Sequence, residues 1–179
     1  MLIVAALCAA PVIASYLAFY VWQPHGRVNY GDLLEAPTLP ELPLKRLDGR
    51  PFRLSELRGK WVMLTADAGE CGVACETKLL MMRQVRLTQG REMGRIERVF
   101  LITDDAPLST MLLREFDGTR MVRAAGSPLL GALPAEGERA EHIYLVDPLG
   151  NLMLRFPKDA DPNRMKKDIE RLLKTSRIG

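Results

Sequence analysis

Residues 61–83, WVMLTADAGECGVACETKLLMMR, contain the change of pattern that decides the fold. The stretch begins with an apolar run, Trp61 to Leu64, which predicts a strand buried on both faces. A short polar loop follows, and Cys71 and Cys75 come where a helical pattern begins. The sequence therefore predicts two thiols at the turn between a buried strand and a helix.

The position and spacing of these two cysteines have chemical meaning. The first turn of a helix has unpaired N–H groups and a partial positive charge, which favour the thiolate, the reactive and metal-binding form. If the helix has begun by Cys71, the spacing places both sulfurs on one face, where they can close a disulfide or hold one soft metal ion. Cys71 is then the better candidate nucleophile. The alternative is that both are small buried side chains, as free cysteines often are.

Length and composition limit the class of protein. The chain has 179 residues, enough for one domain with accessory segments. Its net charge of +3, with 26% charged residues, is too small and too mixed for a nucleic-acid-binding surface, and 6% aromatic residues provide no platform for base stacking. Three cysteines are too few for a disulfide-stapled scaffold.

The N-terminal part differs from the rest of the chain. Leu2 to Trp22 contains no charged residue and ends in aromatic residues, so we expect residues 1–22 to be an uncleaved transmembrane anchor. A cleavable signal peptide is the competing interpretation, although a basic start is missing. Residues 23–40 are polar, with glycines and prolines, and are predicted to be a linker in which His25 is interfacial. Residues 41–179 then form the globular domain.

The globular part alternates strands and helices. The predicted order is a hairpin around Asp48-Gly49, strand 61–66, a helix from the cysteines to Gly90, strand 95–103, helix 108–116, strand 118–124, a hairpin of strands 142–146 and 151–156, and a helix from Asp161. This order predicts an α/β, thioredoxin-like fold with a central mixed sheet flanked by helices.

The last helix has one apolar stripe and an otherwise basic surface. Its charges fit two interpretations, a solvated face near a helix C-terminus or a patch that touches anionic headgroups or an acidic partner. The basic residues are Arg164, Lys166, Lys167, Arg171, Lys174 and Arg177.

The predicted anchor, the linker, the early hairpin, the cysteine pair at the start of a helix and the late hairpin together resemble the Sco (SenC) family. The most specific matches are CGVAC at 71–75 and YLVDPLG at 144–150. The resemblance implies a thioredoxin-like copper protein that serves in assembly of the copper centre of cytochrome c oxidase. It also implies a single-pass protein of the bacterial inner membrane with its soluble domain in the periplasm. The expected partner is the copper-site subunit of the oxidase or another assembly factor.

The resemblance also implies a copper site. The family binds copper, as Cu(I) or Cu(II), with its two motif cysteines and a histidine, which correspond here to Cys71, Cys75 and His142. The family's histidine lies about five residues before the hairpin tyrosine, whereas His142 lies two before Tyr144, and such a shift reverses the face of a strand. His142 is therefore either the third ligand or a strand histidine bonded to backbone or lying at the surface.

Three functions follow from these patterns together with what the resemblance implies. The first is copper binding, thiol–disulfide exchange, or both, through Cys71 and Cys75 during oxidase assembly, closer to a copper chaperone or thiol–disulfide reductase than to a classical enzyme. The second is a periplasmic thiol–disulfide oxidoreductase without copper. The third is a non-enzymatic assembly or scaffold relative whose cysteines only staple the turn. A thiol peroxidase is disfavoured, because Ala68 and Leu64 replace its usual hydroxyl and proline.

Overall fold

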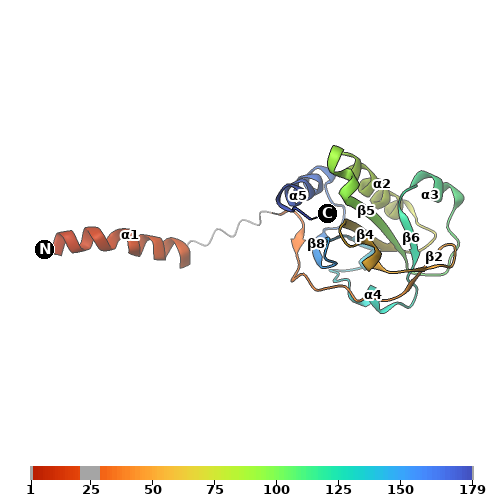
Figure 1. The fold of residues 1–179 in the computed structure, drawn as a ribbon, viewed down its shortest axis with the longest axis horizontal. Coiled ribbons are helices and arrows are strands. Elements are labelled where there is room, and N and C mark those ends of the chain that lie inside the picture. Colours follow the sequence, from red (N-terminus) through yellow and green to blue (C-terminus); the bar gives the residue numbers. More distant parts are fainter. Residues whose placement is uncertain (1, 21–28, 179) are drawn as a thin grey trace.

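The computed structural model describes residues 2–20 and 29–178. Helix α1, Leu2–Tyr20, precedes a domain built on one eight-stranded sheet (Figure 1). None of the helices formed by the described residues combines the length and the apolar character needed to cross a membrane. Trp22, the end of the predicted anchor, and His25 lie outside the described residues.

The middle of the sheet is mixed. Strand β4, Trp61–Asp67, pairs in parallel with β5, Ile96–Ile102, and β5 pairs in parallel with β6, Arg120–Arg123. On its other side β4 pairs antiparallel with β7, Ile143–Val146, which forms the predicted late hairpin with β8, Leu152–Phe156. The first six residues of β4 are all buried, which confirms the strand that the apolar run predicts.

The two edges of the sheet are formed by short strands. The predicted hairpin around Asp48-Gly49 is confirmed as β2, Leu44–Arg46, and β3, Pro51–Phe52, with β2 antiparallel to β6. At the opposite edge, β1, Asp32–Leu33, pairs antiparallel with β8. The prediction that residues 23–40 form a linker is therefore wrong for 29–40. This segment adds a strand to the open edge of β8, because an unpaired edge offers backbone groups for pairing.

Helices cover both faces of the sheet, as predicted (Figure 1). Three helices share one hydrophobic cluster on one face, and these are α2, Val73–Leu87, α3, Thr110–Glu115, and α5, Pro162–Thr175. The other face is covered by loops, by α4, Pro128–Gly131, and by the 3-10 helix η1, Leu54–Leu57. Two further 3-10 helices, η2, Gly90–Arg95, and η3, Arg139–Glu141, precede β5 and β7. The carboxyl end of β4 and the start of α2 thereby hold the two cysteines against the first cluster.

Candidate functional site

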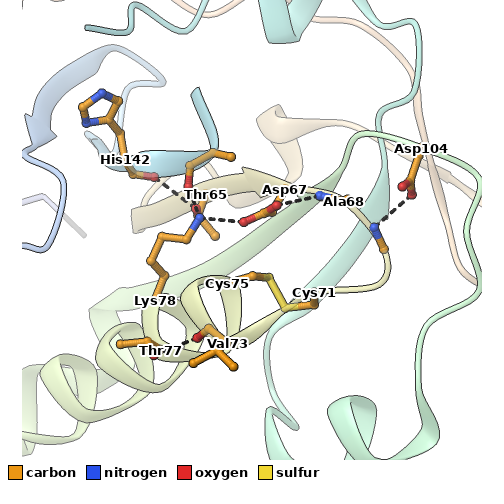
Figure 2. The surroundings of a disulfide bond; sticks show 12 residues. Thr65, Asp67, Ala68, Cys71, Val73, Cys75, Thr77, Lys78, Asp104 and His142 are labelled. Carbon is orange, nitrogen blue, oxygen red and sulfur yellow. Dashed lines mark hydrogen bonds and ion pairs between the residues drawn. A yellow bond between two sulfur atoms is a disulfide. The ribbon is translucent and has the colours of Figure 1, made fainter. Parts of the chain in front are cut away.

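Cys71 and Cys75 form a disulfide at the start of α2 (Figure 2). Their Cα atoms lie 5.1 Å apart, which confirms that the motif can bring both sulfurs together. The helix begins at Val73 rather than at Cys71, because Cys71 has a left-handed backbone with φ of 42°. Its N–H closes a turn by donating to the carbonyl of Ala68 at 3.1 Å. Cys75 therefore belongs to the first turn of the helix, whereas Cys71 precedes its N-cap, Gly72.

The disulfide lies just below the surface. Cys71 is 3% exposed and Cys75 2%, whereas Val73 between them is 83% exposed. Because both sulfurs are covered, any molecule that reacts with the disulfide must come close to the start of α2.

The loop before Cys71 is fixed by the loop that follows β5. The N–H of Gly69 donates to Oδ1 of Asp104 at 2.9 Å, and the N–H of Ala106 donates to the same oxygen at 3.2 Å. Arg123 holds this second loop by donating to the carbonyls of Asp104 and Ala106, each at 3.1 Å. The two loops lie so close together that a Cβ at Gly69 would be 2.7 Å from the carbonyl oxygen of Ala106. The sequence pattern gives no sign of this role, because it places Asp104 only in the loop after the predicted strand 95–103.

An ion pair connects the cysteine helix to the sheet. Lys78, one turn after Cys75, places its Nζ 2.8 Å from Oδ2 of Asp67 at the end of β4, and both side chains are mostly buried. The same ammonium donates to the carbonyl of Ala140 in η3. These contacts hold α2, β4 and η3 together next to the disulfide (Figure 2). No sequence signal identifies the pair, because its members lie on different elements.

A cavity of about 350 Å³ opens beside the first turns of α2. Its lining includes Ala74, Thr77 and Met81 of α2, together with Glu141 and Lys158. The ammonium of Lys158 is hydrogen-bonded to Glu141 and lowers the pKa of that carboxyl. The pair adds a polar group to a mainly apolar hollow.

His142 lies apart from the disulfide. Its side chain is buried, 4% exposed, and its ring contacts two backbone carbonyl oxygens, Nδ1 to Phe156 at 2.9 Å and Nε2 to Glu136 at 3.0 Å. Figure 2 shows the ring turned away from the two sulfurs, while the backbone oxygen of His142 accepts a hydrogen bond from Thr65 at 3.0 Å. The structure thus brings Cys71 and Cys75 together and places His142 in contact with backbone, one of its two predicted environments.

This arrangement does not fit a copper site with two cysteines and a histidine. A metal ligand needs a free ring nitrogen, and both nitrogens of His142 are occupied by carbonyls on the side away from the sulfurs. Within residues 2–20 and 29–178, no group of three or more His, Cys, Asp or Glu side chains could hold a metal ion. The reduced cysteines themselves stay available as two soft ligands.

Comparison with known proteins identifies the domain. Residues 61–176 match the family model described as transmembrane-like, thioredoxin-like, C-terminal domain. No protein with a curated description matches the sequence. The domain does resemble solved structures of thioredoxin-like proteins, all at low sequence identity.

Several of these structures are Sco proteins, and two of them are described here. Copper-bound ScoI of Arabidopsis thaliana is 16% identical, with a TM-score of 0.62 over 78% of this chain and 100% of that one. BsSco, a member of the Sco family of cytochrome c oxidase assembly proteins studied for its disulfide switch, is 14% identical, with a TM-score of 0.60 over 82% and 98%. A third is the thioredoxin domain of a thiol-disulfide oxidoreductase from Bacteroides vulgatus, 16% identical, with a TM-score of 0.58 over 79% and 99%. These similarities confirm the predicted thioredoxin-like fold.

Proposed function

The chain belongs to the family described as transmembrane-like, thioredoxin-like, C-terminal domain, and from this premise we propose that it exchanges electrons with partner proteins through Cys71 and Cys75. The observation that carries the proposal is the disulfide itself, held at the strand-to-helix turn of a thioredoxin-like fold and within reach of the surface.

The exchange runs in two steps that conserve electrons. In the reduced protein, the thiolate of one cysteine attacks a sulfur of the partner's disulfide, forms a mixed disulfide and releases the partner's other sulfur as a thiolate. The second cysteine then attacks the mixed disulfide and closes the Cys71–Cys75 bond. The partner's disulfide has gained two electrons and two protons, and this chain's dithiol has lost them. Cys71 is the proposed nucleophile, because it directly precedes the helix N-cap, at the end of the helix that carries a partial positive charge.

The proposed setting is oxidase assembly at a bacterial inner membrane, with the domain in the periplasm. BsSco, which has the same fold, is a member of a family of cytochrome c oxidase assembly proteins. The partner would be the copper-site subunit of that oxidase or another assembly factor. An oxidising compartment suits a disulfide-forming pair.

We also propose that the N-terminal segment holds the protein at the membrane. Residues 2–22 contain no charged side chain. Five large side chains of α1 are more than half exposed, and an exposed apolar surface of this kind needs a covering. They are Val12, Ile13, Tyr16, Leu17 and Tyr20.

Copper binding by the reduced pair is a second candidate. It is favoured by the C-x-x-x-C spacing and by the shared fold with a Sco protein solved with copper bound. Because the ring of His142 contacts backbone carbonyls, the candidate ligands here are the two thiolates, which suit Cu(I). The disulfide must first be reduced, so copper loading and oxidation exclude each other at this site.

The test of thiol–disulfide exchange uses the full chain in detergent micelles and a disulfide-bonded model peptide as probe. We expect the reduced chain to reduce the peptide, and both Cys71→Ser and Cys75→Ser to abolish this activity. Cys75→Ser should accumulate a mixed disulfide with the peptide through Cys71. Cys8→Ser is the matched control, because Cys8 is the exposed cysteine that takes no part in the disulfide. Exchange no faster than that of the double variant lacking Cys71 and Cys75 would reject the proposal and leave the scaffold interpretation.

A further inference from the structure

Helix α5 carries the charge imbalance of the whole chain. Its fourteen residues include five basic and two acidic side chains, an excess of three positive charges, which equals the net charge of the full sequence. The rest of the chain is therefore balanced, and the positive charge of this protein is a local property of one helix.

The exposed basic residues of α5 lie on one side of the helix. At about 100° per residue, they fall within roughly 80° of one another around its axis. We call them the α5 stripe, and they are Arg164, Lys167, Arg171 and Lys174. The opposite side of α5 is buried in the core. Lys174 lies 2.8 Å from Glu170, but both side chains are exposed, so water and salt weaken that pair.

The described start of the domain lies beside α5 (Figure 1). The N–H groups of Tyr30 and Gly31 donate to Oδ2 of the buried Asp168, at 2.7 and 2.9 Å. The guanidinium of Arg164 lies 4.1 Å above the Tyr30 ring, and the Tyr30 hydroxyl accepts from the N–H of Asp161 at 2.9 Å. Four contacts thus hold Tyr30 and Gly31 against α5 and its N-cap.

The connection between this point and α1 is short. Eight residues, 21–28, separate the end of α1 from the described start of the domain, and eight residues span at most about 28 Å when fully extended. A membrane that holds α1 therefore lies within reach of the α5 stripe. Several positive side chains close together are attracted strongly to anionic headgroups, whereas acidic side chains on the same face would weaken that attraction.

From this juxtaposition we propose that the α5 stripe docks on the anionic headgroups of the membrane that holds α1. The inference rests on the proposed membrane anchoring and adds an orientation to it. Docking would place α5 on the membrane and direct the β2–β3 edge, at the other end of the sheet, away from it.

Lysine acetylation of the full chain tests the proposal. The protein is added from detergent to preformed vesicles of phosphatidylcholine, alone or with about one quarter phosphatidylglycerol. We expect Lys167 and Lys174 to be acetylated roughly three-fold or more slowly on the anionic vesicles, and salt at about 1 M to remove the difference. Lys45 in β2 is the internal control, because it is exposed at the far edge of the sheet.

A pair of charge variants sharpens the test. Arg164→Gln/Arg171→Gln removes half of the stripe and keeps both reporter lysines, so acetylation should return toward the rate on neutral vesicles. Arg50→Gln/Arg53→Gln, near the opposite edge, removes the same charge and should change nothing.

Flotation of the vesicles distinguishes the proposed membrane anchor from the proposed docking of the α5 stripe. Equal acetylation on both vesicle types, with the protein still floating with neutral vesicles, would overturn docking while leaving the anchor, and an acidic protein would become the candidate occupant. Failure to float with neutral vesicles would overturn the anchor, and with it the membrane orientation inferred from docking.

Discussion

Gly69 provides a sharp test of how the cysteine loop is held. Substitution by alanine introduces a Cβ that would lie 2.7 Å from the carbonyl oxygen of Ala106 and 3.0 Å from Oδ1 of Asp104. The first contact is with backbone, which cannot rotate away, so the two loops must separate. No positive φ is involved at this position, and the effect is therefore one of packing.

The expected loss of stability follows from two contributions. Overpacking of a well-fitted contact costs about 1 to 3 kcal/mol, and weakening the hydrogen bond from the Gly69 N–H to the Asp104 carboxylate costs roughly 1 kcal/mol more at this part-buried site. We expect Gly69→Ala to lower the free energy of unfolding by about 2 to 4 kcal/mol, which shifts the urea midpoint by roughly 1 to 2 M.

The assay is urea unfolding of the oxidised domain, residues 29–179, followed by far-UV circular dichroism. Gly131→Ala is the matched control, because its Cβ would meet no atom within 4 Å. It should be neutral or slightly stabilising, by up to about 1 kcal/mol. If the two variants unfolded within about 0.5 kcal/mol of each other, the close approach of the two loops would not contribute to stability, and the argument for Asp104 as a positioning residue would fail.

Three further outcomes follow from the site and its surroundings. His142→Ala should leave the Cu(I) affinity of the reduced chain within about three-fold in an anaerobic titration, whereas Cys75→Ser lowers it by roughly 100-fold or more; a comparable loss in both would restore His142 as a ligand. Burial raises the pKa of Tyr144 to about 12, above its ordinary value of 10.0, so the folded state holds this proton more tightly than the unfolded chain. The resulting stability, at most about 3 kcal/mol, is complete below pH 10 and declines as the pH rises toward about 12. Tyr144→Phe should flatten this part of the pH profile of urea unfolding. Asp168→Ala should destabilise the domain by roughly 2 to 4 kcal/mol and accelerate amide exchange at residues 30 and 31, while Glu170→Ala, on the exposed side of the same helix, should leave that exchange unchanged.

Elements whose causes are local were predictable from the sequence. The apolar run from Trp61 predicts a buried strand wherever it pairs, and β4 is that strand. Asp161 followed by proline predicts a helix start, and the Asp161 carboxylate does accept from the N–H of Asn163 at 2.8 Å. The pairing of Cys71 with Cys75 is equally local, because a spacing of four residues brings both sulfurs together even though the helix starts two residues after Cys71.

Contacts between distant segments were not predictable in the same way. Strand β1 has two residues and no alternating pattern of its own, and it exists because Asp32 lies opposite Arg155, far along the chain. Their side chains also meet, at 3.1 Å. Asp168 looks in sequence like one more charge on a polar helix, yet it is buried because two backbone N–H groups satisfy its carboxylate. A pattern within one segment carries no information about such partners.

The orientation of the His142 side chain depends on the register of the β7–β8 hairpin. For this reason the sequence alone allowed two environments for His142. In the hairpin, Ile143 lies opposite Phe156, so His142 falls just before the paired residues, where its ring reaches the Phe156 carbonyl. Three positions earlier is Arg139, the first residue of η3, directly after Glu138, which borders the cavity beside Ala74. Moving a histidine there is therefore the substitution most suited to adding a third ligand to the two thiolates. Gain of Cu(I) affinity in Arg139→His, with His142 retained, would show that position rather than residue type separates this chain from a three-ligand copper site. An unchanged affinity would show that the loop before β7 cannot bring a side chain to the sulfurs at all.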